Sequence, residues 1–342
     1  MKNKVFGLDI GTTSIKVVWL TKSGEGYVLN SVLTSPSPVK GMISESPLDQ
    51  QEMAQIIAKI VQDASIDVKG VNVALPESQV YTRVIEMPVL SDKELASAIY
   101  WEAEQYIPVP LNTITLDYKV LHRPAPQEGT KMTVLLVGAP TILINKYEHV
   151  LSLAGMTIES LETEILSVLR AVVVGDNFPT SMILNIGAIN SSLAIVKNNV
   201  LSFTYSIPTG GIALSRAIAA DFGFSINQAE EYKKVYGLSE ANFSGKIGKA
   251  TEPILSSILT ETKKSLAYYG EKYPEDPIKQ IILSGGTAKL PGLNSYFAQN
   301  LGIETVVANP WKILASQEVP KEILDDAPSY TISVGLAMRE YE

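Results

Sequence analysis

The stretch GLDIGTTSIKVVWL at residues 7–20 has a partner later in the chain, ILNIGAINSSLAIV at residues 183–196. Both copies contain Leu-x-Ile-Gly between apolar segments, but Asp9 of the first copy is replaced by Asn185 in the second. A segment that recurs within one chain indicates a repeated structural unit. The sequence therefore predicts two related domains, of which the second has lost a carboxylate.

Each copy opens the same series of elements. Runs rich in β-branched residues, separated by short polar turns, predict an antiparallel three-stranded meander in each half, at 5–10, 15–20 and 27–34 and at 182–186, 193–196 and 200–207. Apolar residues at helical spacing predict a helix from Pro47 to about residue 64, before a strand at 71–75. The second meander precedes predicted helices at 212–222, 227–236 and 252–269 and a strand at 279–283.

Residues 79–157 do not match the repeat. A strand is followed by a helix that Ser91 and Glu94 open as a capping box, then by strands at 113–121 and 131–137 and a helix at 144–154. We interpret this segment as an inserted α+β subdomain. The predicted first domain is 1–78, completed by 158–178 and 318–342; the insert is 79–157; the second domain is 179–317, with 212–277 as its helical subdomain.

The composition excludes several classes of function. The 342 residues carry a formal charge of −8, which repels phosphate backbones and argues against a nucleic-acid partner. The absence of cysteine excludes thiol catalysis, disulfides and Cys-ligated zinc. No apolar run approaches the roughly 18 residues that span a bilayer, so we expect a cytoplasmic protein. The two histidines, His122 and His149, receive no role.

The first turn, DIGTTS, offers groups that can hold phosphates. Gly11 lets the backbone approach an anion, and the polar side chains that follow it add donors. Asp9 can hold a hydrated Mg²⁺ beside the phosphates. Alone, the pattern also fits an ordinary hairpin with a polar bend. Its repetition favours two domains that face one phosphate chain across a cleft.

Two further motifs fit the same cleft. In IILSGGTAKLPGL, Gly285 and Gly286 permit close approach to a base or a sugar. In QAEEYKKVYG, Glu230 and Lys233 lie on one helical face and can reach a ribose or a purine together. Alone, this second pair also fits a solvated ion pair.

These motifs in this order resemble the actin-like ATPase superfamily, through DIGTTS, NIGAINS, IPTGG, the Glu-x-x-Lys helix and LSGGTAKLPGL. The position of the insert resembles the FtsA and PilM branch, and VALPESQVYTRVIEMP and ELASAIYWEAEQYIPVP resemble the PilM family of type IV pilus assembly. The resemblance implies an actin-like, ribonuclease H-like α/β fold with two domains and a nucleotide in the cleft between them.

The resemblance also implies a nucleotide site, with ATP and Mg²⁺ as cofactors and with the metal held by Asp9, through water. The residues that match the superfamily motifs are Asp9, Gly11, Thr12, Thr13, Ser14 and Lys16 in the first phosphate turn, Asn185, Gly187 and Ala188 in the second, Gly210 and Gly211 after it, Glu230 and Lys233 on the adenosine-side helix, and Gly285, Gly286 and Thr287 in the adenosine loop. No catalytic residue is assigned.

The family resemblance further implies a partner. A groove beside the insert is expected to hold the N-terminal cytoplasmic peptide of a PilN-like membrane protein. The predicted function is that of a cytoplasmic, ATP-binding adaptor of the pilus machinery that couples nucleotide state to peptide binding. Its place would be the inner face of the membrane, through that partner.

Asn185 departs from the superfamily pattern. Members that hydrolyse ATP quickly generally place an acid in this second turn, so we predict slow or absent hydrolysis. A small-molecule kinase or ATPase on the same fold remains an alternative and would need a carboxylate near the γ-phosphate, for which Glu164 and Asp221 stay open. An FtsA-like division protein is a further alternative, against which the acidic ending ISVGLAMREYE argues, because it lacks a basic amphipathic anchor.

The insert helix carries Tyr100, Trp101 and Tyr106. Aromatic residues on such a helix fit peptide binding, but packing in a core explains them more often. We therefore leave them outside the predicted site.

Overall fold

The computed structural model describes residues 5–24, 26–125, 129–239, 243–315 and 319–339. Its strands are β1 (Val5–Ile10), β2 (Ser14–Ser23), β3 (Gly26–Pro36), β4 (Gly70–Leu75), β5 (Tyr81–Pro88), β6 (Ile114–His122), β7 (Lys131–Pro140), β8 (Thr157–Thr163), β9 (Ser181–Ile186), β10 (Ser191–Lys197), β11 (Val200–Ile207), β12 (Gln280–Ser284) and β13 (Glu304–Val307). Its α-helices are α1 (Pro47–Asp63), α2 (Asp92–Tyr106), α3 (Thr141–Leu153), α4 (Glu164–Val172), α5 (Gly211–Phe222), α6 (Ile226–Tyr236), α7 (Lys246–Lys272), α8 (Leu293–Leu301), α9 (Lys321–Asp325) and α10 (Thr331–Met338).

Two five-stranded sheets share one topology, which confirms the predicted two-domain α/β fold. Their strand orders are β3-β2-β1-β4-β8 and β11-β10-β9-β12-β13. In each sheet an antiparallel meander is extended by parallel strands, since β1 pairs in parallel with β4 and β9 with β12. The turn between β10 and β11 holds Asn198 and Asn199 at positive φ, as a tight two-residue hairpin requires.

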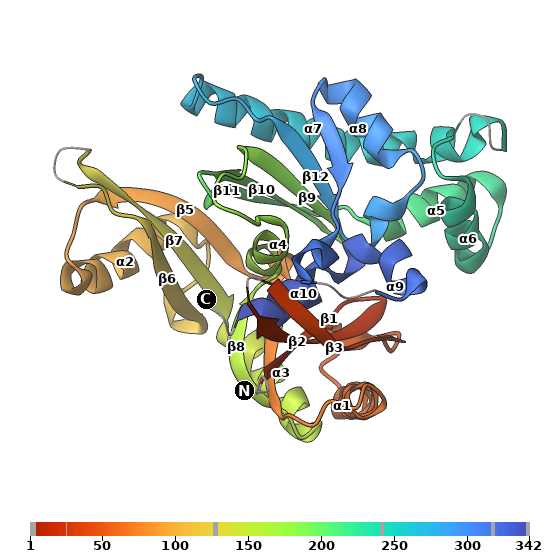
Figure 1. Cartoon of the computed structure of the whole chain (residues 1–342), viewed down its shortest axis with the longest axis horizontal. Coiled ribbons are helices and arrows are strands. Elements are labelled where there is room, and N and C mark those ends of the chain that lie inside the picture. The colour runs from red at the N-terminus through yellow and green to blue at the C-terminus, as the bar shows by residue number, and fades with distance from the viewer. Residues whose placement is uncertain (1–4, 25, 126–128, 240–242, 316–318, 340–342) are drawn as a thin grey trace.

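Helices α4 and α10 lie between the two sheets (Figure 1). One core cluster joins Ala74 of the first sheet and Ile183 of the second to Val168 of α4 and Leu336 of α10. All eight residues of α10 are buried. Strands β1 and β9 are buried along their whole length, as expected of strands that are covered on both faces. The cores of the two domains therefore meet on this pair of helices.

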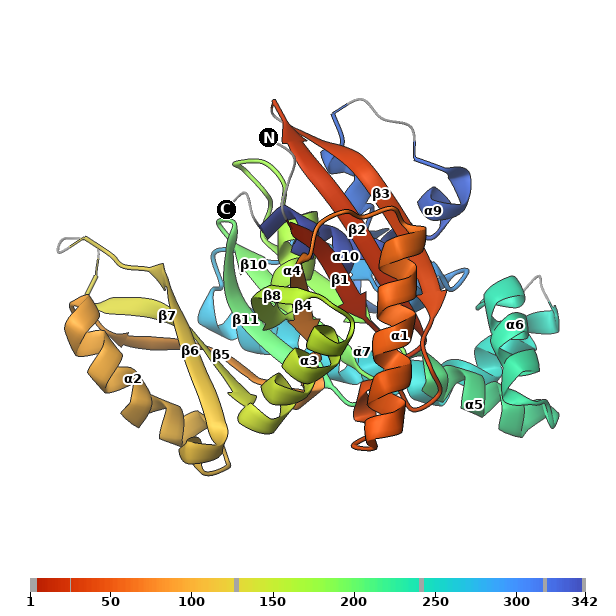
Figure 2. The ribbon, with the colours of Figure 1, turned by 90° about the horizontal axis from the view of Figure 1, so that it is seen from below.

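The outer face of the first sheet is covered by α1 and α3 (Figure 2). Ile57 of α1 and the α3 residues Tyr147 and Val150 share a core cluster with Phe6 of β1. Helix α3 falls within the predicted insert at 79–157, but its apolar face packs on the first domain. The difference arises because helical periodicity predicts a helix without saying which sheet it covers.

The end of the predicted second domain also packs elsewhere. Trp311 and Ile313 share a core cluster with Val18 and Leu20 of β2, so the chain has returned to the first domain before residue 317. The predicted division between 317 and 318 lies outside the described residues, as do residues 340–342 of the acidic ending.

The insert has a core of its own between α2 and the antiparallel sheet β5-β7-β6. The predicted capping box is present, because Ser91 Oγ accepts from the Glu94 amide at 3.4 Å and Glu94 Oε2 from the Ser91 amide at 2.9 Å. Glu86 of β5 forms an ion pair of 2.7 Å with Lys272 at the end of α7. The insert therefore contacts the second domain as well as the first.

Glycine allows the closest contacts of α10. A Cβ on Gly335 would lie 1.8 Å from the carbonyl oxygen of Ser167 in α4, and a Cβ on Gly7 would lie 2.2 Å from that of Ser333 in α10. Real Cβ atoms do not approach a backbone oxygen so closely, so α10 lies against α4 and β1 only because both positions lack a side chain.

We expect Gly335→Ala to destabilise the protein by about 3 kcal/mol or more, because the added methyl group forces two buried helices apart. Urea unfolding followed by circular dichroism measures this. Gly270→Ala in α7 is the matched control: no atom lies within 4 Å of its added Cβ, so helix propensity should stabilise it by about 0.5–1 kcal/mol. Equal stability of Gly335→Ala and the wild type would contradict the close crossing.

Candidate functional site

The two repeated turns close in the same way. The Gly11 amide donates to the Ser14 carbonyl oxygen at 3.1 Å, and the Gly187 amide to that of Asn190 at 3.0 Å. A Cβ on Gly11 or Gly187 would lie 2.8 or 2.9 Å from that same carbonyl oxygen. Both turns thus require glycine because the chain folds back directly against it.

The first turn presents free donors at its tip. Thr12 and Thr13 are exposed, and within the described parts of the chain their amides donate to no protein acceptor. Ser37, which follows β3, holds the turn with two hydrogen bonds. Its Oγ donates to the Gly11 carbonyl oxygen at 2.6 Å, and its amide donates to the Thr13 carbonyl oxygen at 3.2 Å. Successive free amides of this kind form a concave site for an anion.

The charges beside the two turns differ. Asp9 and Lys16 are paired across β1 and β2, both are buried, and Lys16 Nζ lies 3.9 Å from Asp9 Oδ2. Burial raises the pKa of the Asp9 carboxyl, and the positive charge of Lys16 offsets part of that effect. The equivalent cross-strand pair in the second domain is Asn185 and Ser192, which is also buried but has no charge. The second turn has therefore lost a cation together with the carboxylate.

The residues after the second turn hold it in place. The Gly211 and Ile212 amides donate to the carbonyl oxygens of Gly187 and Ala188 at 2.9 and 2.8 Å. A Cβ on Gly210 would lie 2.7 Å from the Gly187 oxygen. The start of α5 thus uses its first donors on the turn itself, and Gly210 and Gly211 act by allowing this close packing.

The predicted pair on α6 is tied to the start of α5. Lys233 Nζ donates to the Gly211 carbonyl oxygen at 3.0 Å, to Ser215 Oγ at 2.9 Å and to Glu230 Oε2 at 2.6 Å. These three bonds use all three donors of the buried ammonium group. The Glu230 side chain keeps about a third of its surface exposed. Of the two residues, Glu230 is therefore the one available to a ligand.

The predicted adenosine loop lies beside the second turn. Thr287 Oγ1 donates to the Gly187 carbonyl oxygen at 3.2 Å, and a Cβ on Gly285 would lie 2.8 Å from Asn185 Oδ1. Gly286 is exposed, and apart from its neighbours in sequence no atom of the described residues lies within 4 Å of its added Cβ, so its surface is open. The structure thus brings the second turn, the start of α5, α6 and the adenosine loop into one hydrogen-bonded group.

The first turn joins this group through the C-terminal segment. The Gly285 amide donates to the Pro328 carbonyl oxygen at 2.8 Å, and Lys16 Nζ lies 5.9 Å from the centre of the buried Tyr330 ring. Asn190 of the second turn also donates to Ser78 Oγ, just after β4, at 2.9 Å. The two domains therefore contact each other next to both turns.

Two further acids lie near the first turn, the half-buried Glu164 and the buried Glu77. Glu164 Oε2 accepts from the Glu77 amide at 3.4 Å, and burial raises the pKa of the Glu77 carboxyl. Burial and the negative charges of Asp9 and Glu77 raise the pKa of Glu164 to about 8. Burial and the charges of Glu164 and Asp9 likewise raise the pKa of Tyr147. Asp221, the other acid considered, is exposed at the end of α5.

The donors fit a magnesium ion only together with a nucleotide. Among the described residues, no group of three His, Cys, Asp or Glu side chains is arranged to hold a metal. Asp9 supplies one carboxylate beside an anion site, and Mg²⁺ commonly takes one or two carboxylates, waters and phosphate oxygens. When bound there, the ion would neutralise phosphate charge.

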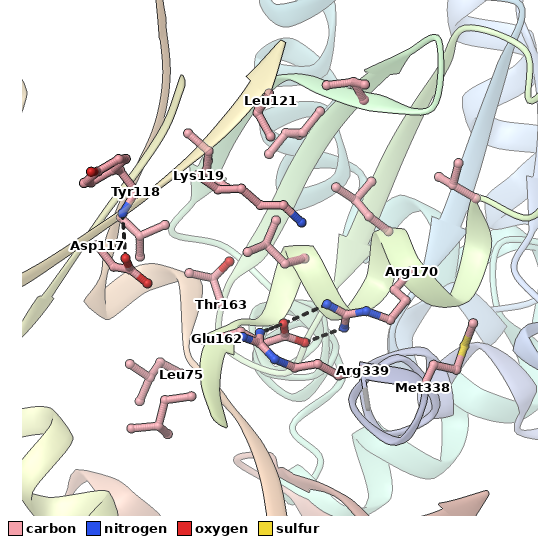
Figure 3. Close-up of a pocket in the computed structure, with 18 of the residues that line it drawn as sticks. Leu75, Asp117, Tyr118, Lys119, Leu121, Glu162, Thr163, Arg170, Met338 and Arg339 are labelled. Atoms are coloured by element: carbon pink, nitrogen blue, oxygen red, sulfur yellow. Dashed lines mark hydrogen bonds and ion pairs between the residues drawn. The ribbon is translucent and has the colours of Figure 1, made fainter. Parts of the chain in front are cut away.

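A second feature is a pocket of about 800 Å³ between the insert and the two domains (Figure 3). Its walls include Lys119 and Leu121 of β6, Leu75 and Leu161 of the first sheet, Val200 and Leu201 of β11, Val173 after α4, and Met338 and Arg339 at the end of α10. Strands β6 and β8 both line it, and each is the outermost strand of its sheet. An apolar pocket bordered by strand edges suits an extended peptide.

An ion cluster around the buried Glu162 forms one end of the pocket. The Glu162 carboxylate accepts from Arg170 at 2.6 and 2.9 Å and also pairs with Arg339 (Figure 3). These arginines hold the pKa of Glu162 below its ordinary value despite its burial. Lys119 extends from β6 toward the same end. The pocket is thus mainly apolar, and the side chains at this end of it are charged.

The three insert aromatics lie outside this pocket and outside the core. Trp101 is 71% exposed, Tyr100 47% and Tyr106 38%, so the expectation that core packing explains them is wrong. Helix α2 covers the insert sheet with Leu95, Ile99 and Ala103 instead.

The fold and the paired turns define an actin-like protein. MreB5 of Spiroplasma citri bound to AMPPNP superposes with a TM-score of 0.56 at 13% identity, over 98% of this chain and 96% of that one. EutJ of Carboxydothermus hydrogenoformans superposes with a TM-score of 0.58 at 16% identity, over 97% of this chain and 88% of that one. At these identities the likeness shows the fold alone.

Within this class the chain belongs to the PilM family, because the family described as type IV pilus assembly protein PilM matches residues 7–341. The structure of a PilM-PilN type IV pilus biogenesis complex matches with a TM-score of 0.86 and 27% identity, over 100% of both chains. The predicted PilM membership is confirmed. The cell division protein FtsA of Streptococcus pneumoniae serotype 2 is a more distant relative, at 24% identity over 89% of this chain and 75% of that protein.

Within the described residues, no helix is both long enough and apolar enough to cross a bilayer.

We expect Glu164→Gln to change how stability depends on pH. The folded pKa of about 8 lies above the ordinary 4.5, so the wild type loses stability as pH rises from about 5 to 8, while glutamine does not titrate. Urea unfolding in EDTA should give nearly equal stabilities at pH 5 and an advantage for the variant on the order of 2 kcal/mol at pH 8. Glu159→Gln, at an exposed position of β8, should keep the wild-type pH dependence. Parallel curves for Glu164→Gln and the wild type would show that Glu164 is ionised in the folded protein.

Proposed function

We propose that this chain is an ATP-binding adaptor of the type IV pilus machinery, which holds the N-terminal cytoplasmic peptide of a PilN-like membrane protein and couples that binding to its nucleotide state. The observation that carries the proposal is the presence of two separate features in a PilM-family chain: paired glycine turns between two domains, and an apolar pocket beside the insert. Through such a partner, a cytoplasmic protein would act at the inner face of the membrane.

The nucleotide part is supported by the chemistry of the cleft. Free amides and hydroxyl groups at Thr12 and Thr13 suit phosphates, and the Asp9–Lys16 pair offers both a carboxylate for hydrated Mg²⁺ and a cation. On the adenosine side, Glu230 is the acceptor for ribose hydroxyls and Gly286 offers an open backbone surface. An actin-like neighbour, MreB5, is bound to AMPPNP.

Slow hydrolysis is supported by the acids near the turns. Asn185 has no charge with which to hold Mg²⁺ or to orient water, and the cross-strand Ser192 adds none. Glu164 is the remaining candidate for a general base, but a pKa of about 8 leaves its carboxyl protonated at neutral pH. A kinase or ATPase would need an ionised carboxylate here, so turnover separates the two functions.

The peptide part is supported by the shape and edges of the pocket. A structure of a PilM-PilN complex is similar to this chain over its full length. Strands β6 and β8 are each the outermost strand of a sheet in the described part of the chain, and an extended peptide can add to such an edge while its apolar side chains enter the pocket.

For the nucleotide site, we expect calorimetry with Mg-ATP to show binding by the wild type and a loss of at least about tenfold in affinity for Asp9→Ala, because the metal-side carboxylate is gone. Asp221→Ala, which removes an exposed acid on α5, should bind as the wild type does. Bound ATP should stay intact, with turnover well below the roughly 1 s⁻¹ at the low end of common enzymes. Fast release of ADP would favour the enzyme instead, and no binding at all would leave only the adaptor role.

For the pocket, we expect Leu121→Asp to weaken binding of a labelled PilN N-terminal peptide by about tenfold or more, because it places a charge against the bound apolar side chains. Fluorescence anisotropy measures the affinity. Val89→Asp is the matched control, since Val89 is an exposed apolar residue of the insert outside the pocket. Equal losses in both variants, or in neither, would place the peptide elsewhere.

A further inference from the structure

Helix α10 runs from the nucleotide cleft to the peptide pocket. Its first residue, Thr331, directly follows Tyr330, whose ring lies near Lys16 of the first turn. Its last residue, Met338, and the next residue, Arg339, line the pocket. A single buried helix of eight residues therefore has one end at each of the two sites.

At the cleft end, an unbroken chain of buried hydrogen bonds links the second turn to α10. Ser284 Oγ donates to Asn185 Oδ1 at 3.1 Å and accepts from the Thr331 hydroxyl group at 2.6 Å; that hydroxyl group also lies 3.1 Å from the Pro328 carbonyl oxygen. All three side chains are less than 5% exposed. Ser284 belongs to the second sheet and Thr331 to the C-terminal helix, so this series of hydrogen bonds crosses between the two domains.

At the pocket end, α10 contacts the Arg339–Glu162–Arg170 ion cluster. Arg339 pairs with Glu162, and Arg170 of α4 binds both Glu162 and the Gly335 carbonyl oxygen, at 3.0 Å for the latter. Figure 3 shows these side chains together beside Met338. A change in the position of α10 would therefore move groups that form the pocket.

Between its ends, α10 has little freedom to deform. Gly335 lies against the Ser167 carbonyl oxygen of α4, and Asn72 of β4 donates to the Leu336 carbonyl oxygen at 2.9 Å. Close-packed elements shift as units because voids and overlaps are both costly. Displacement of one end of α10 is thus passed to the other.

We propose that α10 is the element that transmits nucleotide occupancy to the peptide pocket, with the Asn185–Ser284–Thr331 chain as its connection to the cleft and the Arg339–Glu162–Arg170 cluster as its connection to the pocket. The inference rests on the proposed function, since it requires both ligands. A ligand on the second turn moves Asn185, and the chain passes that change to Thr331. The same path works in reverse, because coupling between two binding sites is reciprocal.

The test is the ratio of the PilN peptide affinities measured with and without saturating Mg-ATP. We expect a ratio of about fivefold or more in the wild type, in either direction. Thr331→Val keeps the shape of the side chain but removes the hydrogen bond to Ser284. The ratio of affinities should therefore fall to within about twofold of one. The peptide affinity measured without nucleotide should stay at the wild-type value. Ser284→Ala should reduce the ratio to the same extent, and the double variant should add nothing further, because both changes break one chain.

Ser333→Ala is the matched control. Ser333 is a buried hydroxyl residue on the same helix, but it donates to the Tyr330 carbonyl oxygen within its own segment, so its loss should leave the ratio unchanged. An unchanged ratio in both Thr331→Val and Ser284→Ala, or a loss that Ser333→Ala shares, would overturn the inference alone. A wild-type ratio of one with both ligands bound would overturn it together with the coupling in the proposed function. Failure of the wild type to bind ATP or the peptide would instead overturn the proposed function, and this inference with it.

Discussion

The arrangement of the two domains depends on how closely α10 lies against α4 and β1. Gly335 and Gly7 leave no Cβ at these contacts, so the backbones meet at distances that any side chain would prevent. The same two helices carry the apolar residues on which both sheets pack. The shape of the pocket depends on the same pair of helices, because Arg170 of α4 and Met338 of α10 line it.

The repeated turns share one backbone geometry, but the side chains beside the first are charged and those beside the second are neutral. Each glycine closes its turn with an equivalent hydrogen bond. The first domain places a buried carboxylate and a cation beside its turn, whereas the second places an amide and a hydroxyl there. A buried charge without a partner of opposite sign is costly, which agrees with Asp9 lying opposite Lys16 and the neutral Asn185 lying opposite the neutral Ser192. The two turns therefore differ in charge, because a buried ion pair lies beside the first and neutral side chains lie beside the second.

Much of the candidate site could be predicted from the sequence, because glycines and polar residues recur there in motifs. The roles of single residues were harder to predict from the sequence. Lys233 looks like a ligand contact in sequence, yet its ammonium group is fully used in holding α5 and α6 together. Ser37, Glu77 and Tyr147 carry no signal, because each is an ordinary polar residue until distant segments pack around it. The exposed Trp101 also shows that an aromatic residue on an amphipathic helix need not face the core.

The sequence by itself determined the two related domains, the order of their strands and helices, the insert within the first domain, and the absence of a charge at position 185. These features depend on local periodicity, on capping and on backbone conformations that glycine permits, all of which are written in neighbouring residues. Only the tertiary structure decided that α3 covers the first sheet, that a pocket forms from the insert, both sheets and the ends of α4 and α10, and that Ser284 meets Thr331. Such contacts join segments far apart in the chain, and they are selected by the fit of whole buried surfaces, which no local pattern specifies.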